Sequence, residues 1–272
     1  MVSGKPSKEH RQITVNGIIF HKTNLFKNKR VMNIEVKSTA EFNDFAARRI
    51  LSIIEATVDH QGHCTVALSG GNTPKEVYAH IANLYPEYDI NWRRVFFFWG
   101  DERMVSIEDA NNNAHMAYEY MLDALPVPDF NIFPFRTELG AEAAAADMEE
   151  KIRNHFDVLT INAFDLTLLG LGEDGHTLSL FPHSYAMKVM GQWVYGYYVN
   201  ERMGHRVTFL PVPINNSMNT LFLVKGENKA EVVKHVLFGR KDIDLYPAQA
   251  IRPNNGKLEW ILDESAAAKV KK

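Results

Sequence analysis

The residues best suited to chemistry lie between positions 164 and 182, where an apolar run gives way to glycines and ionisable side chains. The run, residues 164–169, has the length of a buried strand. Three glycines follow within six residues. Asp174 lies directly before the last of them and His176 directly after it. Glycine allows sharp turns and close approach of a ligand, and ligands of open α/β sheets bind beyond the carboxyl ends of strands. The pattern therefore predicts a site on this loop, with His176 as the reactive group.

Asp174 lies two residues before His176, with a glycine between them. A carboxylate at this spacing can hold the imidazole in one tautomer and support a positive charge on it, as a general base requires. The alternative is a loop histidine that serves only as a hydrogen-bonding partner. A metal site would need a further ligand, and His183 is seven residues away, so we expect no metal and no cofactor. A serine nucleophile is not expected, because Gly-x-Ser-x-Gly is absent.

A second glycine turn follows a short apolar strand at residues 64–68 and precedes a helical pattern. Paired glycines ahead of a helix leave backbone N–H groups free at the positive end of the helix dipole, which suits an anion such as phosphate. The alternative is a tight turn with a threonine N-cap. The turn matches neither the P-loop nor the dinucleotide fingerprint. The candidate binding residues are Ser69, Gly70, Gly71, Asn72 and Thr73.

Three basic residues are further candidates for binding a phosphate. Arg103 follows two acids at the end of an apolar strand, where neighbouring carboxylates could orient its guanidinium toward phosphate oxygens. Arg206 begins an alternating strand. Lys229 lies in the first turn of a predicted helix, where the helix dipole does not favour a cation. Ordinary surface charge is the alternative for each of them.

Strands alternate with helices along the chain. This predicts an α/β fold with a doubly wound, mostly parallel, Rossmann-like sheet, helices on both faces and a smaller β-rich C-terminal portion. The expected strands are residues 31–36, 64–68, 95–99, 131–133, 164–169, 193–199, 206–210, 220–224 and 256–262. The expected helices begin at a capping box at residues 38–41, near Pro74, and at residues 111, 141 and 227. Because parallel strands end at one edge, the polar loops at residues 69–73, 101–103 and 170–177 should cluster.

Composition narrows the class of protein. With 46% hydrophobic and 23% charged residues the chain is typical of globular proteins, and a net charge of −3 does not favour a nucleic-acid partner. The single cysteine excludes an internal disulfide and favours a cytoplasmic setting. No apolar run reaches the roughly 20 residues that span a bilayer, and the start lacks the apolar segment of a signal peptide. We expect no membrane partner, and a monomer or small homo-oligomer.

Residues 1–30 differ from the remainder because they are rich in Lys and Arg and contain one acid. We expect a basic, poorly ordered extension with a short hairpin around residues 13–20. A basic arm for anionic partners such as nucleic acid is the alternative. Residues 31–272 show no composition break and are expected to form a single domain.

From about Asn33 to about Ala268 the chain resembles the 6-phosphogluconolactonase family, of the glucosamine-6-phosphate isomerase/6-phosphogluconolactonase superfamily. The Ser-Gly-Gly-Asn-Thr-Pro turn, the Asp-Glu-Arg segment and Gly-His-Thr-Leu-Ser-Leu-Phe-Pro are similar to family motifs in family order. Three positions depart from the common pattern: Asn72 stands for serine, Leu178 for alanine and His183 for glycine. The residues after the histidine favour the lactonase branch, since the deaminase branch has Gly-His-Ile-Ala-Phe-Asn-Glu-Pro there.

The resemblance implies hydrolysis of 6-phospho-D-glucono-1,5-lactone to 6-phosphogluconate, in the oxidative pentose phosphate pathway. His176 would be the base, supported by Asp174, and Arg103, Arg206 and Lys229 would hold the phosphate with the 69–73 turn. One alternative is glucosamine-6-phosphate isomerisation and deamination. Another is a non-catalytic sugar-phosphate sensor, which would normally carry a DNA-binding domain that residues 1–34 are too short to form.

Overall fold

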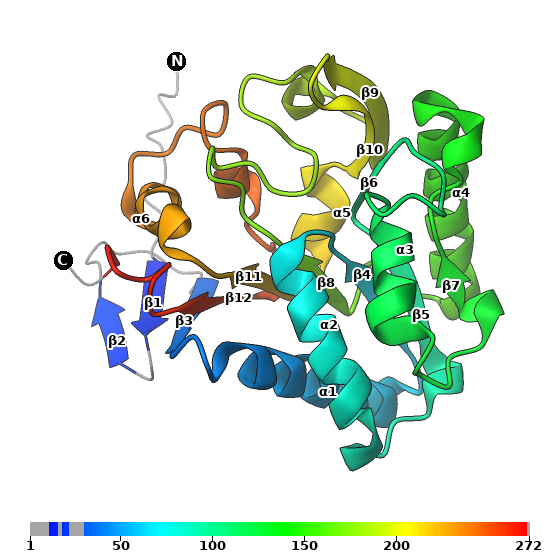
Figure 1. The fold of residues 1–272 in the computed structure, drawn as a ribbon, viewed down its shortest axis with the longest axis horizontal. Helices are drawn as coiled ribbons and strands as arrows, with labels where there is room; N and C mark the ends of the chain where they lie inside the picture. Colours follow the sequence, from blue (N-terminus) through cyan, green and yellow to red (C-terminus); the bar gives the residue numbers. More distant parts are fainter. Residues whose placement is uncertain (1–10, 16–17, 22–29, 271–272) are drawn as a thin grey trace, which may run out of the picture.

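The computed structural model describes residues 11–15, 18–21 and 30–270, with side chains from Met32 onward. Its centre is a nine-stranded sheet in the order β2-β1-β3-β12-β11-β8-β4-β5-β7 (Figure 1). Every neighbouring pair is parallel except β1 with β2. The strands are β1 (Arg11–Val15), β2 (Ile18–His21), β3 (Arg30–Lys37), β4 (Cys64–Leu68), β5 (Val95–Trp99), β7 (Ile132–Phe133), β8 (Leu166–Leu169), β11 (Asn219–Val224) and β12 (Lys257–Asp263).

A second, antiparallel sheet contains three strands in the order β6-β10-β9. They are β6 (Asp101–Arg103), β10 (Gly204–Phe209) and β9 (Val194–Asn200). The predicted β-rich C-terminal portion is thus divided, because β11 and β12 join the main sheet. β6 is missing from the sequence-based prediction, since three charged residues show no apolar alternation. The remaining expected strands are confirmed, as is the predicted doubly wound sheet.

The helices lie on both faces of the main sheet. Helices α1, α2 and α3 cover one face, and α4, α5 and α6 lie on the other (Figure 1). The bounds are α1 (Phe42–Gln61), α2 (Asn72–Leu84), α3 (Asn113–Ala117), α4 (Ala141–Leu159), α5 (Pro211–Asn216) and α6 (Ala230–Phe238). A π-helical turn at Tyr118–Leu122 extends α3, and a 3-10 turn at Glu227–Lys229 precedes α6.

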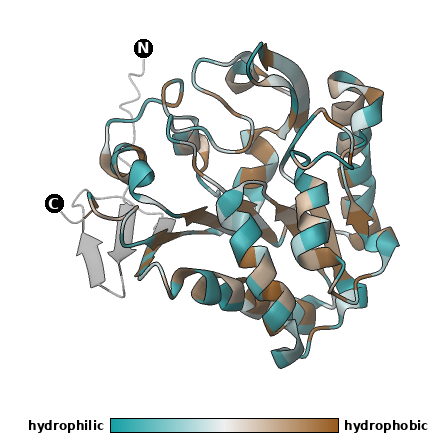
Figure 2. Ribbon diagram, in the orientation of Figure 1, coloured by the Kyte–Doolittle hydropathy of each residue, from teal (hydrophilic) through white to brown (hydrophobic). Residues whose placement is uncertain are grey.

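Local sequence signals account for the ends of α1. Glu41 N–H donates to Ser38 Oγ at 3.3 Å, and Ser38 N–H donates to the Glu41 carboxylate at 3.4 Å, which forms the predicted capping box in the turn directly before Phe42. Gly62 ends the helix with a φ of 81°, a left-handed conformation that glycine adopts readily. Between these ends polar and apolar residues share the helix surface, as they do on the other outer helices (Figure 2).

The chain changes direction between β4 and β8, which are neighbours in the sheet. From β4 it proceeds through α2 to β5, toward one edge, whereas from β8 it proceeds toward β11 and β12 and the other edge. The connections therefore leave adjacent strands in opposite directions. A crevice at such a topological switch point is the usual ligand site of open α/β sheets. The three predicted loops follow β4, β5 and β8, which are adjacent, so the expectation that they cluster is confirmed.

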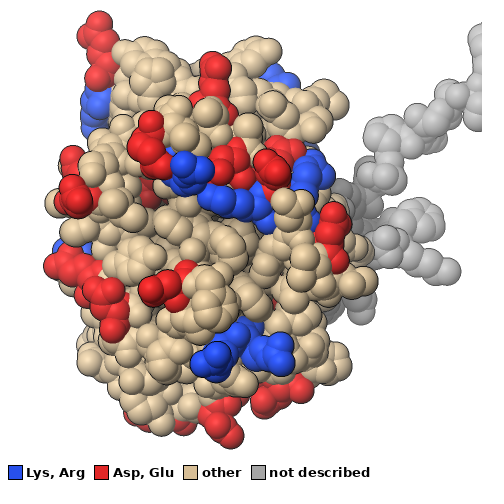
Figure 3. Space-filling model, turned by 90° about the vertical axis from the view of Figure 1, so that its right-hand side faces the viewer, with Lys and Arg blue, Asp and Glu red and all other residues tan. Residues whose placement is uncertain are grey.

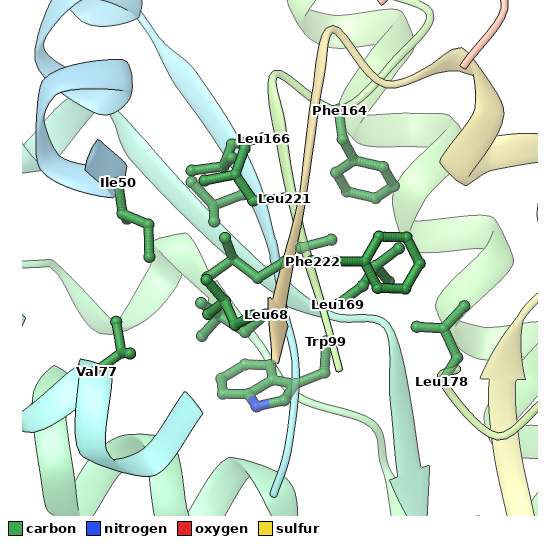
Figure 4. Packing of buried hydrophobic residues seen from close by; sticks show 14 of the residues in the cluster. Ile50, Leu68, Val77, Trp99, Phe164, Leu166, Leu169, Leu178, Leu221 and Phe222 are labelled. Carbon is green, nitrogen blue, oxygen red and sulfur yellow. The ribbon is translucent and has the colours of Figure 1, made fainter. Parts of the chain in front are cut away.

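The core packs on both sides of these central strands. Ile50 of α1 and Val77 of α2 contact one side, and Phe164, Phe222 and Leu178 lie on the other (Figure 4). All five side chains are buried. Paired residues on neighbouring strands also stack, as in the parallel rings of Phe222 and Trp260 at 3.8 Å. This packing holds the carboxyl ends of the strands in a rigid frame.

The face that carries α4 has acidic and basic side chains interspersed (Figure 3). Ion pairs join Arg136 and Lys151 to Asp147, and Arg153 to Glu149. Within residues 11–15, 18–21 and 30–270, no helix is both long and apolar enough to cross a membrane. The predicted hairpin is formed by β1 and β2, and β1 pairs with β3. Residues 1–10, 16–17 and 22–29, the remainder of the predicted poorly ordered extension, lie outside the described residues.

Candidate functional site

The loop after β8 holds His176 against Asp174. The Nδ1 atom of His176 lies 2.6 Å from Oδ1 of Asp174, and the same oxygen accepts the His176 backbone N–H at 3.1 Å. The histidine ring also packs against Phe181, with ring centroids 4.6 Å apart. The side chain of His176 is 30% exposed, so its second nitrogen can be reached by solvent or substrate. The predicted pairing of His176 with the Asp174 carboxylate is present.

Two glycines make this arrangement possible. A Cβ atom on Gly172 would lie 2.0 Å from His176 Nδ1, well inside van der Waals contact. The Gly172 N–H also donates to the His176 carbonyl at 2.8 Å, which closes the loop. Gly175 has a φ of 87°, and a Cβ there would press on Tyr246. The glycine spacing read from the sequence therefore has a steric cause.

The Asp174 carboxylate is stabilised in its charged form. Partial burial works against ionisation, but the hydrogen bonds and charge of His176 outweigh it and lower the pKa of Asp174 below its ordinary value. An ionised carboxylate can only accept hydrogen bonds. The Nδ1 atom of His176 must therefore be the donor in this pair, so that in a neutral imidazole Nε2 is the nitrogen with the lone pair.

The glycine turn after β4 leads directly into α2. The helix begins at Asn72 with Gly71 at the N-cap, so Thr73 is not the N-cap residue. Gly71 has a φ of 103° and open space beside it. Among the described residues, no acceptor faces the backbone N–H groups of Gly70 and Gly71. These free donors at a helix N-terminus are the features expected of an anion site.

The turn lies beside the loop after β8 and beside Arg103. A Cβ on Gly170 would be 3.9 Å from Ser69 Oγ, which places the first and third predicted loops in contact. A Cβ on Gly70 would collide with the side chain of Asn113 at 1.8 Å. The Oδ1 atom of Asn113 in turn accepts a hydrogen bond from Arg103 Nη1 at 3.1 Å. The backbone of the turn and the guanidinium therefore converge on one place.

The expectation that neighbouring carboxylates orient Arg103 is wrong. Its guanidinium donates to the Asn111 carbonyl at 2.8 Å and to the Asn113 side chain. The adjacent acid, Glu102, instead accepts backbone N–H groups of Asn113 and Ala114 at 2.7 and 3.0 Å and caps α3. Because Arg103 has no carboxylate within ion-pairing distance among the described residues, its charge is available to a ligand.

Glu102 and Asn113 are site-building residues that sequence reasoning missed. Glu102 is fully buried, and burial raises the pKa of its carboxyl to about 8 despite three backbone hydrogen bonds. Asn113 is 2% exposed and links Gly70, Arg103 and the Asp101 carbonyl, to which it donates at 2.8 Å. The run of three asparagines at 111–113 was a visible signal, but only the tertiary structure shows what it holds.

Arg206 lies opposite Arg103 in the antiparallel pairing of β10 with β6. Burial, and then the charge of Arg103, lower the pKa of Arg206. Its guanidinium donates to the backbone carbonyls of Met203 and His205. In the described part of the chain Arg206 likewise lacks an ion-paired carboxylate. Two half-buried guanidinium groups side by side repel one another, and a dianion between them would relieve that repulsion.

Lys229 lies in the 3-10 turn before α6 and interacts electrostatically with the acids of the histidine loop. Burial lowers the pKa of its amine, and the charges of Glu173 and Asp174 oppose that shift. The neighbouring Asn228 donates to Glu173 at 2.6 Å, so the turn is fastened to the histidine loop. The structure thus places Lys229 beside the acids of that loop. It shows no direct contact of Lys229 with either arginine in the described residues.

Two of the three unusual residues have a structural explanation. His183 has a φ of 59°, the left-handed region that favours glycine, and it is held there by a backbone bond and a side-chain bond to Asp244, each 2.8 Å long. Leu178 also has a positive φ, 55°, and packs over Gly100, where a Cβ would approach it to 2.5 Å. Nothing in the structure explains Asn72. No three His, Cys, Asp or Glu side chains are grouped as metal ligands within the described residues.

Comparison with known proteins agrees with this geometry. The family model for glucosamine-6-phosphate isomerases/6-phosphogluconolactonase matches residues 37–260. A 6-phosphogluconolactonase of Synechocystis is 38% identical over 217 residues, covering 78% of this chain and 87% of the relative. One of Nostoc is 35% identical over 225 residues, covering 81% and 90%. The solved structure of 6-phosphogluconolactonase from Trypanosoma brucei matches with a TM-score of 0.74 at 32% identity, covering 87% of this chain and 98% of that one.

The match includes the three loops that meet at the switch point and the two strands that carry the arginines. The relatives are similar over most of their own length, so the likeness extends well beyond a shared motif. Fold, loop order and sequence therefore lead to one assignment. The chain belongs to the glucosamine-6-phosphate isomerase/6-phosphogluconolactonase family.

Proposed function

We propose that this chain hydrolyses 6-phospho-D-glucono-1,5-lactone to 6-phospho-D-gluconate, with His176 as the general base. The observation that carries the proposal is the His176–Asp174 pair at the switch point, together with Arg103 and Arg206, for which the described residues provide no ion-paired carboxylate. The names of the relatives support the reaction class. We place the reaction in the oxidative pentose phosphate pathway and in the cytoplasm, which the single cysteine favours.

In the proposed mechanism His176 activates a water molecule. Its Nε2 atom takes one proton as the water oxygen attacks the lactone carbonyl carbon, and Asp174 stabilises the imidazolium that forms. The tetrahedral intermediate then collapses, the bond from carbon to ring oxygen breaks, and the imidazolium returns the proton to that oxygen. The base is regenerated, and one water molecule has been consumed.

Phosphate anchoring supplies orientation in this proposal. Arg103 and Arg206 would contact the phosphate together with the N–H groups of the 69–73 turn, and Lys229 would add a further positive charge. Charge-assisted bonds from guanidinium to phosphate are short and directional. Fixing the far end of the substrate in this way presents the lactone carbonyl to a stationary base, which lowers the entropic part of the barrier.

The test is a coupled assay in which freshly made lactone is supplied and its disappearance is compared with the spontaneous rate. We expect wild type to accelerate hydrolysis, and His176→Ala to lower kcat by about 10² to 10⁴, the usual contribution of a general base, with little change in substrate binding. His183→Gly is the matched control, because it removes a second histidine–aspartate pair from the same loop and suits the local φ. Wild-type turnover by His176→Ala would remove that residue from the mechanism.

Arginine variants test the phosphate assignment separately. Arg103→Ala and Arg206→Ala should each raise KM, because the phosphate loses a charge-assisted partner. An unchanged KM in both variants would contradict the anchor. Release of ammonia from glucosamine 6-phosphate distinguishes the deaminase reaction of the wider family, and we expect none.

A further inference from the structure

Ser179 connects the histidine loop to the sheet that carries the two arginines. It lies three residues after His176 and is 1% exposed. Its N–H donates to Thr208 Oγ1 at 3.1 Å, its hydroxyl donates to Asp101 Oδ2 at 2.6 Å, and its carbonyl accepts the Tyr197 hydroxyl at 2.6 Å. Every polar group of this residue is therefore bonded to the small sheet.

The three partners come from the three different strands of that sheet. Asp101 belongs to β6, Thr208 to β10 and Tyr197 to β9. Thr208 is directly opposite Asp101 in the β6–β10 pairing, as Arg206 is opposite Arg103. Residues two apart on a strand face the same side of a sheet. The side chains of Asp101 and Thr208, which bond to Ser179, therefore lie on the same face of the small sheet as the two guanidinium groups. They are two positions away from the arginines along β6 and β10.

The chain between His176 and Ser179 is short and constrained. Thr177 and Leu180 form a bridge, with the Leu180 N–H donating to the Thr177 carbonyl at 3.0 Å. The Thr177 hydroxyl donates to the Gly170 carbonyl at 2.8 Å, and Leu178 is held in a left-handed conformation over Gly100. A displacement of Ser179 relative to the strands would therefore be transmitted to His176.

We propose that Ser179, through Tyr197, Asp101 and Thr208, is a positioning residue that sets the distance between the phosphate anchor and the base. This inference rests on the proposed function and deepens it. The anchor lies on β6 and β10, whereas the base lies on the loop after β8, so substrate held by one is presented correctly to the other only if the two are fixed together. A misplacement of about 1 Å can cost on the order of 10² in rate.

The experiment compares two substrates. Tyr197→Phe removes one hydroxyl and keeps the ring, and Ser179→Ala removes the bond to Asp101. Tyr195→Phe is the matched control, because Tyr195 is on the same face of β9, stacks on Tyr197 at 5.6 Å and has no hydrogen bond from its hydroxyl among the described residues. Each variant is assayed with 6-phospho-D-glucono-1,5-lactone and with unphosphorylated D-glucono-1,5-lactone, which cannot use the anchor.

We expect Tyr197→Phe and Ser179→Ala to lower kcat for the phosphorylated lactone about tenfold or more, with KM changed little, because the anchor itself is intact. Their kcat/KM for the unphosphorylated lactone should stay near wild type, as should both values for Tyr195→Phe. An equal loss on both substrates would overturn the proposal, since it would mean that Ser179 only stabilises the loop. Unchanged kinetics in both variants would also overturn it.

A second measurement separates this inference from the proposed function. Inorganic phosphate should slow amide hydrogen exchange in residues 170–180 of wild type and Tyr195→Phe. The reason is that an anion bound by Arg103 and Arg206 makes the histidine loop more rigid through the bonds of Ser179. The effect should be lost in Tyr197→Phe. Equal protection in all three proteins would overturn the positioning role. Wild type without lactonase activity would contradict the proposed function, and the exchange data would still decide the role of Ser179.

Discussion

Gly172 leaves no room for a side chain beside His176. A Cβ atom at this position would lie 2.0 Å from the ring nitrogen, far inside van der Waals contact, and only 2.6 Å from Oδ1 of Asp174. The ring and the carboxylate belong to the same loop, so a displacement of either one alone would break their 2.6 Å bond. At the scale of single residues, the space that a missing side chain leaves is as important as the reactive group.

Gly172→Ala should therefore lower kcat by about 10² or more while the protein remains folded, because misplacing a base by about 1 Å has that effect. The measurement is steady-state kinetics with a thermal unfolding curve for each protein. Gly170→Ala is the control, since in the described part of the chain a Cβ there would meet Ser69 Oγ alone, at an ordinary 3.9 Å. Similar activities for the two variants would contradict the steric argument.

Asp174→Asn tests the role of the carboxylate. An amide can present its NH₂ group to the histidine, which would favour the proton on Nε2 and remove the free lone pair. We expect kcat to fall by about 10² to 10⁴. Since the pKa of Asp174 is lowered, its support of the pair is present above the ordinary aspartate pKa and is lost only as pH falls through the lowered value. Wild-type activity at neutral pH in Asp174→Asn would exclude this role.

At the scale of elements, a buried acid organises the start of α3. Glu102 accepts the N–H groups of Arg103, Asn113 and Ala114, which joins β6 to the helix that holds the Arg103 side chain. Burial raises the pKa of this carboxyl to about 8. The same residue is therefore a cap of α3 and a buried group whose ionised form is disfavoured in the folded state.

The raised pKa of Glu102 couples proton binding to folding, and this coupling gives the direction in which stability changes with pH. Between the ordinary glutamate pKa and about 8 the folded protein holds a proton that the unfolded chain has lost, so this group reduces stability as pH rises and has no further effect above about pH 8. Glu102→Gln does not titrate. We expect the free energy of unfolding of wild type, relative to Glu102→Gln, to fall between pH 5 and 8 and then level off. Urea unfolding at five pH values measures it, and a rising difference would contradict the raised pKa.

At the scale of the whole molecule, the site lies far from the N-terminal hairpin. Strands β3, β12 and β11 separate β1 from β8, a span of about 20 Å at the usual spacing between strands. The family match begins at residue 37, after the hairpin. We propose that residues 31–272 form one domain that contains every part of the site, including the small antiparallel sheet.

Removal of residues 1–29 should therefore leave kcat and KM for the lactone close to those of the full chain. The same truncation tests the alternative of a basic arm, through salt-dependent binding of nucleic acid to the full chain alone. We expect no such binding. Loss of turnover in a truncated protein that retains its far-UV circular dichroism would show that the N-terminal segment contributes to the site.

Much of the site was predictable because it is local in sequence. The pair formed by Asp174 and His176 is set by two residues and a glycine, and the capping box at Ser38 and the stop at Gly62 depend on residues within one turn. Apolar runs predicted the central strands, because a strand buried on both faces has few polar positions. These features need no information from distant parts of the chain.

Short stretches of the chain therefore encode the local chemistry, the order of the elements and the edge at which the polar loops meet. Tertiary contacts, by contrast, select the side chains that hold the arginines, the pairing of β6 with β10 in a sheet with β9, and the bonds from Ser179 to all three strands. The hydrogen bond between Ser179 and Asp101 joins residues 78 positions apart. The partners in these contacts depend on the register in which the strands pair. A shift of one residue would move every side chain to the other face of the sheet, and local sequence patterns do not encode the register.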